Sequence, residues 1–254
     1  MPILEPAVAA FVLLFFASMW AGAQNALAGG GSFITLPVLM LTGLDPRAAN
    51  IASAAALFPS QAMSGWQSRG LAAGVGRVRL THLILISLAG GAVGAGILLL
   101  TPVKFFAQIV PWLVLFATTV FAWGSFGPKP APSTRTHDVR TALIQFVIGI
   151  YGGYFGGGNG FLMMAALTMA GQGVRTAGAT KNVAAAAMNL TAVVIFLVMG
   201  KIRWLQVAVA AAGALIGGFA GVWLLRRLDE KVLRVAIVVI GAALAIGLFL
   251  REYR

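Results

Sequence analysis

Two glycine triplets, each followed by a polar side chain, are the feature of this sequence best suited to binding chemistry. Glycine permits sharp turns and lets a ligand approach the backbone closely. A helix that begins after such a triplet presents free N–H groups and the positive end of its dipole, which together favour an anion. We therefore predict two anion-binding positions. They comprise Gly29, Gly30, Gly31 and Ser32 in the first half, and Gly156, Gly157, Gly158 and Asn159 in the second.

Further polar residues lie close to the triplets along the chain. Polar groups inside a membrane bundle are costly and normally face its interior. Hydrogen bonding between helices is the alternative role for about half of them. Lys181 stands just inside an apolar segment, where it either lines an anion path or extends to the interface. The remaining candidate substrate-binding residues are Gln24, Asn25, Asn50, Ser53, Gln61, Lys181, Asn182 and Asn189.

Catalytic and metal chemistry find little support in the residue types present. The chain has no cysteine and only two histidines, too few for a metal centre without carboxylate help. It contains no HExxH and no GxSxG, and its GGGS lacks the GK[ST] of a phosphate-binding loop. An intramembrane hydrolase or phosphatase is the enzyme alternative, and His82 is its sole candidate base near a span. We predict no enzyme activity, no catalytic residue, no metal site and no cofactor.

The composition indicates an all-α polytopic membrane protein. Of 254 residues, 60% are hydrophobic and only 9% are charged, against about a quarter charged in soluble domains. The net charge of +12 fits basic loops against anionic headgroups better than nucleic acid, so we expect the lipid bilayer as partner and no nucleic acid. We expect several crossings of the bacterial inner (plasma) membrane. The apolar segments span about 6–27, 47–68, 80–100, 103–124, 141–155, 178–199, 204–225 and 231–250.

The two halves of the chain look duplicated. AGGGSFITLPVLMLTGLDPRAA (28–49) resembles FGGGNGFLMMAALTMAGQGVRTA (155–177), and GRVRLTHL (76–83) resembles GKIRWLQV (200–207). Two segments that follow the triplets, 33–42 and 161–170, are half the length of a membrane span. We predict two homologous repeats of about four transmembrane helices, each with a short, Gly-initiated re-entrant or broken helix. They occupy 1–126 and 141–254, joined by a polar linker at 127–140.

The direction of the second repeat depends on the short elements. If each dips into the membrane and returns, the halves are parallel; if each crosses, the halves are inverted, as in many transporters. We expect the parallel arrangement, with eight spans and two re-entrant elements. It groups the basic segments 69–79, 124–140, 200–203 and the C-terminus on one side, which would be cytoplasmic.

The two triplet blocks resemble the TauE/SafE family, the membrane permeases called sulfite exporters. The resemblance covers nearly the whole chain and rests on a glycine triplet, a short apolar run, Gly-x-x-Pro and an alanine-rich span. The second copy departs from this pattern, because Met164 stands where the first half has Pro37. The resemblance implies export or exchange of small sulfur-containing anions such as sulfite or organosulfonates. An anion channel, or a carrier for other small anions, is the alternative.

The acidic residues constrain the energetics of transport. Proton relays keep a carboxylate in mid-span, whereas Glu5, Asp45, Asp138, Asp229, Glu230 and Glu252 all map to predicted ends or loops. An anion exporter needs no such relay, because moving one charge through 100 mV is worth about 2.3 kcal/mol. We predict potential-driven export, with sodium coupling through backbone carbonyls as the alternative.

Overall fold

The computed structural model describes residues 4–27, 30–127, 138–225 and 230–252, so Gly29 of the candidate site lies outside it. Regular structure in these ranges is helical apart from one isolated bridge between Val75 and Val78. The described helices are α1 (Leu4–Leu27), α2 (Ser32–Leu41), α3 (Pro46–Ser68), α4 (Leu80–Leu100), α5 (Val103–Phe126), α6 (Asp138–Tyr154), α7 (Asn159–Met169), α8 (Val174–Met199), α9 (Trp204–Leu225) and α10 (Glu230–Glu252).

Four of these helices are long and apolar enough to cross a membrane within the described ranges: α1, α4, α5 and α8. The short helices α2 and α7 have 10 and 11 residues. At a rise of about 1.5 Å per residue they cover roughly half of a 30 Å hydrocarbon core. The described part of the chain therefore has the helices that a membrane protein requires, together with two apolar helices that are too short to span.

Local sequence explains where several helices begin. Asp45 caps α3, because its side chain accepts a hydrogen bond from the Ala48 N–H at 3.0 Å, and Pro46 occupies the first helical position. The helix α7 begins after Gly158, whose φ of +74° lies in the left-handed region that glycine adopts most easily. Gly30, just before α2, has a φ of +86°. Turn-forming residues thus precede both short helices.

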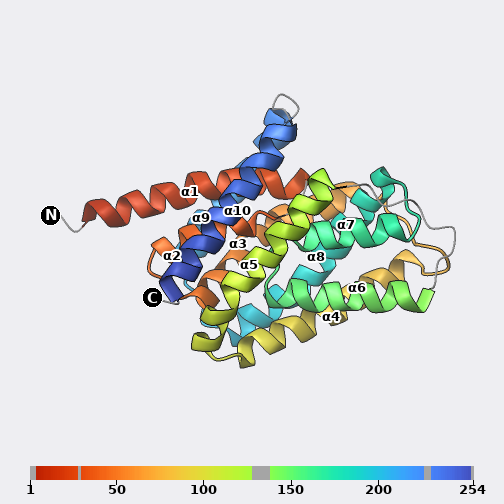
Figure 1. The fold of residues 1–254 in the computed structure, drawn as a ribbon, viewed down its shortest axis with the longest axis horizontal. Helices are drawn as coiled ribbons and strands as arrows, with labels where there is room; N and C mark the ends of the chain where they lie inside the picture. Colours follow the sequence, from red (N-terminus) through yellow and green to blue (C-terminus); the bar gives the residue numbers. More distant parts are fainter. Residues whose placement is uncertain (1–3, 28–29, 128–137, 226–229, 253–254) are drawn as a thin grey trace.

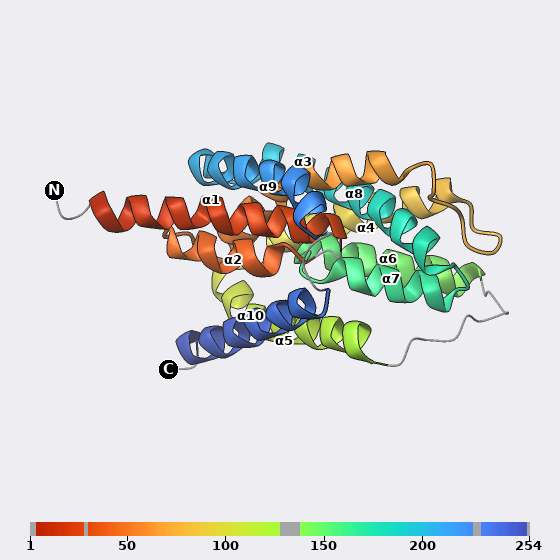
Figure 2. The same ribbon diagram turned by 90° about the horizontal axis from the view of Figure 1, so that it is seen from above.

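Helices from one half of the chain pack mainly against helices from the other half. α1 lies along α9, and α6 lies along α4 (Figures 1 and 2). α3 packs against α8, and α5 packs against α10. Each of these pairings joins the first five helices to the last five, so the two halves form one interlocked bundle.

Glycines allow close contacts between these helices. A Cβ on Gly90 of α4 would lie 2.8 Å from the carbonyl oxygen of Phe146, on α6. A Cβ on Gly217 of α9 would lie 1.7 Å from the carbonyl oxygen of Met19, on α1. Small residues of this kind let membrane helices approach backbone to backbone. Close backbone contact at glycines is therefore common to the α4–α6 and α1–α9 interfaces, which we call glycine seams.

The directions of α3 and α8 contradict the expected parallel arrangement of the halves. The Asn189 amide donates a hydrogen bond to the Gln61 side chain. Further along α3, Ser68 Oγ accepts a hydrogen bond from Asn182 Nδ2, which lies earlier on α8, at 3.0 Å. The two helices therefore run antiparallel, although the sequence alignment makes them counterparts. The parallel expectation was wrong because sequence similarity carries no information on the direction in which a segment enters the membrane.

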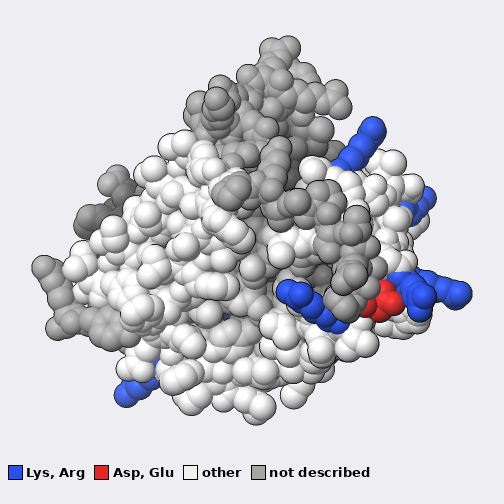
Figure 3. All heavy atoms as spheres, turned by 45° about the vertical axis from the view of Figure 1, so that its right-hand side comes forward, with Lys and Arg blue, Asp and Glu red and all other residues white. Residues whose placement is uncertain are grey.

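The basic segments lie at two opposite ends of the molecule. The parallel arrangement predicts instead that they share one side. We call the end that holds the 69–79 loop and the start of α6 the basic end. There the Arg77 N–H donates to Asp138 Oδ1 at 3.2 Å. The same loop bonds to Thr180 near the start of α8. The 200–203 loop instead follows the C-terminal end of α8, whose Thr180 lies at the basic end, so this loop is at the other end of the molecule. Figure 3 shows Lys and Arg gathered at the basic end; the described ones are Arg69, Arg77, Arg79, Arg140 and Arg175.

Candidate functional site

The first glycine turn folds back against the end of α1. The N–H of Phe33 donates to the Gly30 carbonyl at 3.0 Å, and those of Ile34 and Thr35 donate to the Gly31 carbonyl at 3.1 Å. A Cβ on Gly31 would lie 2.7 Å from the Ala21 carbonyl oxygen, so the turn needs glycine for close approach. Gly30 and Gly31 are both buried.

Beside this turn lies a buried amide that has no partner. Asn25 is 8% exposed, and its Nδ2 donates to nothing in the part of the chain that the structure describes. The N–H groups of Gly31 and Ser32, at the start of α2, also donate to no described residue. Gln24 is buried nearby, with its Nε2 3.5 Å from the position of a Cβ on Gly30. Three donors therefore converge where α2 presents the positive end of its dipole.

The second glycine turn presents a similar set of donors at the start of α7. The backbone N–H groups of Gly157, Gly158 and Gly160 donate to no residue within the described ranges, and all three glycines are buried. Successive N–H groups at a turn with left-handed residues form a concavity that suits an anion. Gly156 and Gly158 have φ values of +80° and +74°. The backbone itself supplies the donors here.

Side chains from three helices hold this second turn in place. The Tyr151 hydroxyl of α6 donates to the Gly157 carbonyl at 2.7 Å. Asn50 of α3 donates from Nδ2 to the Tyr154 carbonyl at 3.0 Å, at the end of α6. Asn159 is 5% exposed and directs its Nδ2 to the sulfur of Met188 on α8, at 3.7 Å. These bonds use carbonyl and sulfur acceptors and leave the amide protons of the turn available.

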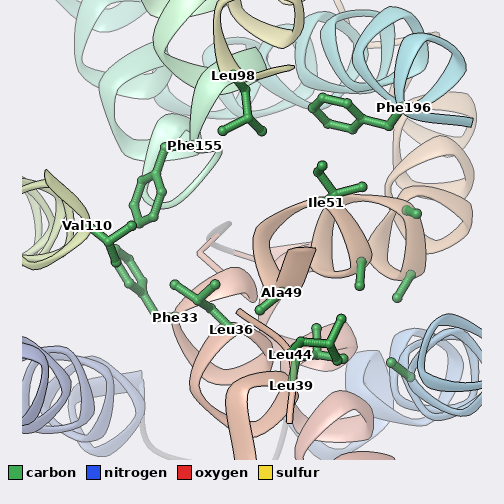
Figure 4. Close-up of a cluster of buried hydrophobic side chains, with 14 of the residues drawn as sticks. Phe33, Leu36, Leu39, Leu44, Ala49, Ile51, Leu98, Val110, Phe155 and Phe196 are labelled. Carbon is green, nitrogen blue, oxygen red and sulfur yellow. The ribbon is translucent and has the colours of Figure 1, made fainter. Parts of the chain in front are cut away.

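An apolar contact closes the space between the two turns. Phe33 follows the first turn and Phe155 precedes the second, and both belong to one buried cluster with Val110 of α5. Figure 4 shows Phe33 and Phe155 on either side of Val110. Phe33 is 2% exposed and Phe155 is 4% exposed. The donor groups are thus separated by packed aromatic and aliphatic side chains.

Several of the predicted polar residues form hydrogen bonds between helices. Ser53 of α3 shares a 2.6 Å hydrogen bond with Thr35 of α2. Gln61 and Asn189 pair across the α3–α8 crossing, and Asn182 bonds to Ser68. The structure therefore brings Asn50 and Ser53 to the two glycine turns, and places Gln61, Asn182 and Asn189 along the α3–α8 seam.

Lys181 is buried near the basic end. It is 5% exposed and forms no ion pair or hydrogen bond with a described residue. Its neighbour Thr180 accepts the N–H of Ala73, in the 69–79 loop, at 3.1 Å. Lys181 thus directly follows a residue that bonds to the loop at the basic end.

Three residues around the turns have no counterpart among the sequence-based candidates: Thr35, Tyr151 and Gly160. Thr35 follows Gly31 by four residues, one turn of helix, and that spacing is the pattern that identifies it. Tyr151 lies six residues before Gly157, and only its hydrogen bond to the Gly157 carbonyl identifies it. Among the described residues, no group of three or more His, Cys, Asp or Glu side chains is placed to hold a metal ion.

Apolar helices of membrane-spanning length, with donor groups at buried helix termini, define a helical membrane transport protein. The chain belongs to the TauE/SafE family, since the family described as "Sulfite exporter TauE/SafE" matches residues 14–248.

Curated relatives extend over nearly the same length. The chain is similar to a "Probable membrane transporter protein ORF9" of Sinorhizobium sp, with 29% identity over 92% of this chain and 90% of that protein. It is 28% identical to a "Probable membrane transporter protein" of Haemophilus influenzae, over 90% of each chain. It is also 28% identical to the "Probable membrane transporter protein YfcA" of Escherichia coli K12, over 92% of this chain and 87% of that one. No solved structure matches the chain.

Proposed function

We propose that this chain exports small sulfur-containing anions, such as sulfite or organosulfonates, across the bacterial inner membrane. The observation that carries this proposal is that the buried N–H groups of Gly157, Gly158 and Gly160 have no partner among the described residues. A hydrogen bond to a charged group is worth about 1.5–3 kcal/mol, and a helix dipole adds about 0.3–1 kcal/mol. Three such donors suit the three oxygens of a sulfite or sulfonate group.

The first turn supplies the second half of the proposed site. Asn25 Nδ2 and the N–H groups of Gly31 and Ser32 are donors of the same kind at the start of α2. We infer that the two turns belong to homologous repeats of inverted direction. The antiparallel α3 and α8, with Gln61 bonded to Asn189, support this inference. Inverted repeats with paired broken helices are a common plan for transporters.

The apolar contact of Phe33, Val110 and Phe155 fits a closed state of such a carrier. An anion that occupied both turns would have to displace these side chains. Alternate separation of the two turns would then expose the donors to one side of the membrane at a time. This distinguishes a carrier from an open channel, in which the donors would line a continuous path.

A flux assay in proteoliposomes tests the proposal. Vesicles loaded with sulfite, with a potassium gradient and valinomycin to make the interior negative, should lose sulfite faster than vesicles without a potential. A potential of 100 mV corresponds to about a fifty-fold equilibrium ratio for a monoanion. Parallel assays with sulfoacetate, sulfate and acetate compare the flux rates of different anions. Flux that ignores the potential and follows a sodium or pH gradient would contradict uniport, and absence of anion flux would contradict the proposed function.

A glycine variant links flux to the second turn. In Gly158→Ala the residue must keep a φ of +74°, and its Cβ would lie 3.1 Å from Ala117 Cβ. The left-handed conformation costs a non-glycine residue about 1–2 kcal/mol, so the turn should distort and anion flux should fall at least several-fold. Gly96→Ala is the matched control, because a Cβ on Gly96 meets nothing within 4 Å. Equal flux in the two variants would argue against a site at this turn.

A further inference from the structure

A cavity of about 230 Å³ lies between α3 and α9, apart from the two glycine turns. Its α3 wall has three polar residues and one methionine, and its α9 wall is small or apolar. The lining residues are Ser60, Met63, Ser64 and Gln67 of α3, with Leu215, Gly218 and Phe219 of α9.

The polar residues of the cavity form a ladder along one face of α3. Ser60, Ser64 and Gln67 are spaced by four and three residues, which places them one above another on a helix. Burial increases along the ladder, because Gln67 is exposed, Ser64 is half-buried and Ser60 is only 4% exposed. Ser64 Oγ donates to the Ser60 carbonyl at 3.0 Å, whereas the Ser60 hydroxyl donates to no described residue. The ladder thus leads from the surface to an unpaired hydroxyl inside the bundle.

Gly218 keeps the inner end of the cavity open. A Cβ on Gly218 would lie 2.8 Å from Ser60 Oγ. The counterpart of Ser60 in the second half is Met188. The two positions are 128 residues apart, as are Gln61 and Asn189, which bond to each other. Met188 is fully buried, and a Cβ on Gly91 of α4 would lie 2.3 Å from its carbonyl oxygen. The second half is therefore packed where the first half is hollow, so the cavity belongs to one side of the molecule.

The mouth of the cavity is at the basic end. Gln67 is followed by Ser68 and by Arg69, the residue at which α3 ends. The Arg69 guanidinium stacks on the Trp66 ring, 3.4 Å from its centroid, which holds the cation beside the mouth. Uncharged donors that faced lipid would be costly, and at membrane depth they are tolerated where they line water.

We propose that this cavity is a water-filled entrance vestibule for the small oxyanion of the proposed function. Arg69 attracts the hydrated anion, and the Gln67 amide, the Ser64 hydroxyl and the Ser60 hydroxyl replace its water in turn as it moves inward. The inference rests on the proposed function for the identity of the solute. The existence of the water-filled vestibule can be tested without any transport measurement.

Single cysteines test the vestibule directly, because the chain has no native cysteine. Ser64→Cys in membrane vesicles is treated with the impermeant, anionic reagent sulfonatoethyl methanethiosulfonate. Arg79→Cys identifies the face of the membrane to which the basic end is exposed, and Val93→Cys, on an exposed apolar face of α4, reports a lipid-facing thiol. We expect Ser64→Cys to react at least ten times faster than Val93→Cys, and only from the face on which Arg79→Cys reacts.

Two results would overturn the proposal. One is a Ser64→Cys thiol as unreactive as that of Val93→Cys, which would mean that lipid or packed protein fills the cavity. The other is reaction from the face opposite to Arg79→Cys. Neither result depends on sulfite flux, so a failure of the vestibule is distinguishable from a failure of the proposed function.

A blocking variant tests whether the anion uses the vestibule. Gly218→Val, made in the Ser64→Cys background, should slow thiol modification and lower sulfite flux by at least ten-fold. Gly96→Val controls for the added bulk, because a Cβ at Gly96 has no neighbour within 4 Å. Both variants are checked for a monodisperse peak in detergent, and if Gly218→Val does not fold, Gly218→Ala replaces it. Unchanged flux in a folded variant whose thiol has become unreactive would overturn the role of the cavity as the entrance.

Discussion

At the residue scale, hydrogen-bond partners distinguish the candidate binding residues from residues that support the fold. Asn25 and Asn50 are both buried asparagines, yet only Asn50 donates to a described acceptor, the Tyr154 carbonyl. A buried amide with no partner costs stability, about 1–3 kcal/mol, and such groups persist where they serve a ligand. The proposed site therefore depends more on Asn25 than on Asn50, although the sequence does not distinguish them.

The contrast between these two residues yields a prediction. Asn25→Leu removes an unpaired donor, so we expect no loss of thermal stability and at least a five-fold rise in the KM for anion flux. Asn50→Leu removes a bond and leaves the Tyr154 carbonyl unpaired, so it should lower stability by about 1–3 kcal/mol. Thermal unfolding in detergent and flux at several anion concentrations measure both effects. A destabilised Asn25→Leu with normal KM would show that Asn25 is a packing residue.

At the element scale, close contacts at glycines determine which helices pack together. α4 lies against α6 through Gly90 and Gly94, and α9 lies against α1 through Gly213 and Gly217. Lipid tails compete with apolar side chains for helix surfaces, so association depends on close van der Waals packing. The glycine spacing alone predicts a seam, while the partner helix is supplied only by the structure.

Filling one seam should prevent folding. In Gly94→Val the Cβ would lie 2.1 Å from the Ile150 carbonyl oxygen, so α4 and α6 must move apart. Overpacking of this kind typically costs about 1–3 kcal/mol, and here the obstacle is backbone that cannot rotate away. We expect a large loss of monodisperse protein after extraction. Gly96→Val, on the open side of the same helix, should give a normal yield, and equal yields would contradict the seam.

At the scale of the whole molecule, the two ends carry different charge. The basic end has Arg69, Arg77, Arg79, Arg140 and Arg175 among its described residues. The end that holds the 200–203 loop has Arg47, Lys104, Lys201 and Arg203 among its described residues. Basic residues concentrate on the cytoplasmic side of membrane proteins. This asymmetry orients the bundle.

We predict that the basic end faces the cytoplasm. A cysteine at Arg79 should react with an impermeant maleimide in inverted membrane vesicles and stay unmodified in intact cells. A cysteine at Lys201 should show the opposite pattern, because the 200–203 loop follows the end of α8 that is far from the basic end. The parallel arrangement expected from the sequence places both residues on one side. Labelling of both from the same side would therefore contradict the fold.

The sequence alone determined the class of this protein and the position of its short helices. Hydrophobic runs and glycine triplets are local features, and the constraint that lipid places on unpaired backbone groups makes them informative. The family follows from the same blocks, which lie within the matched residues 14–248. The polar candidates were recognisable as a group, because polar side chains are rare in apolar spans.

Only the tertiary structure decided which of these residues pair with one another and that α3 and α8 run antiparallel. The pairing of Gln61 with Asn189, the closure by Phe33 and Phe155, and the hollow beside Ser60 all depend on how distant helices cross. A residue's type and its neighbours in sequence contain no information on such crossings. The direction of each helix and the contacts along its faces come from the packing of the whole bundle.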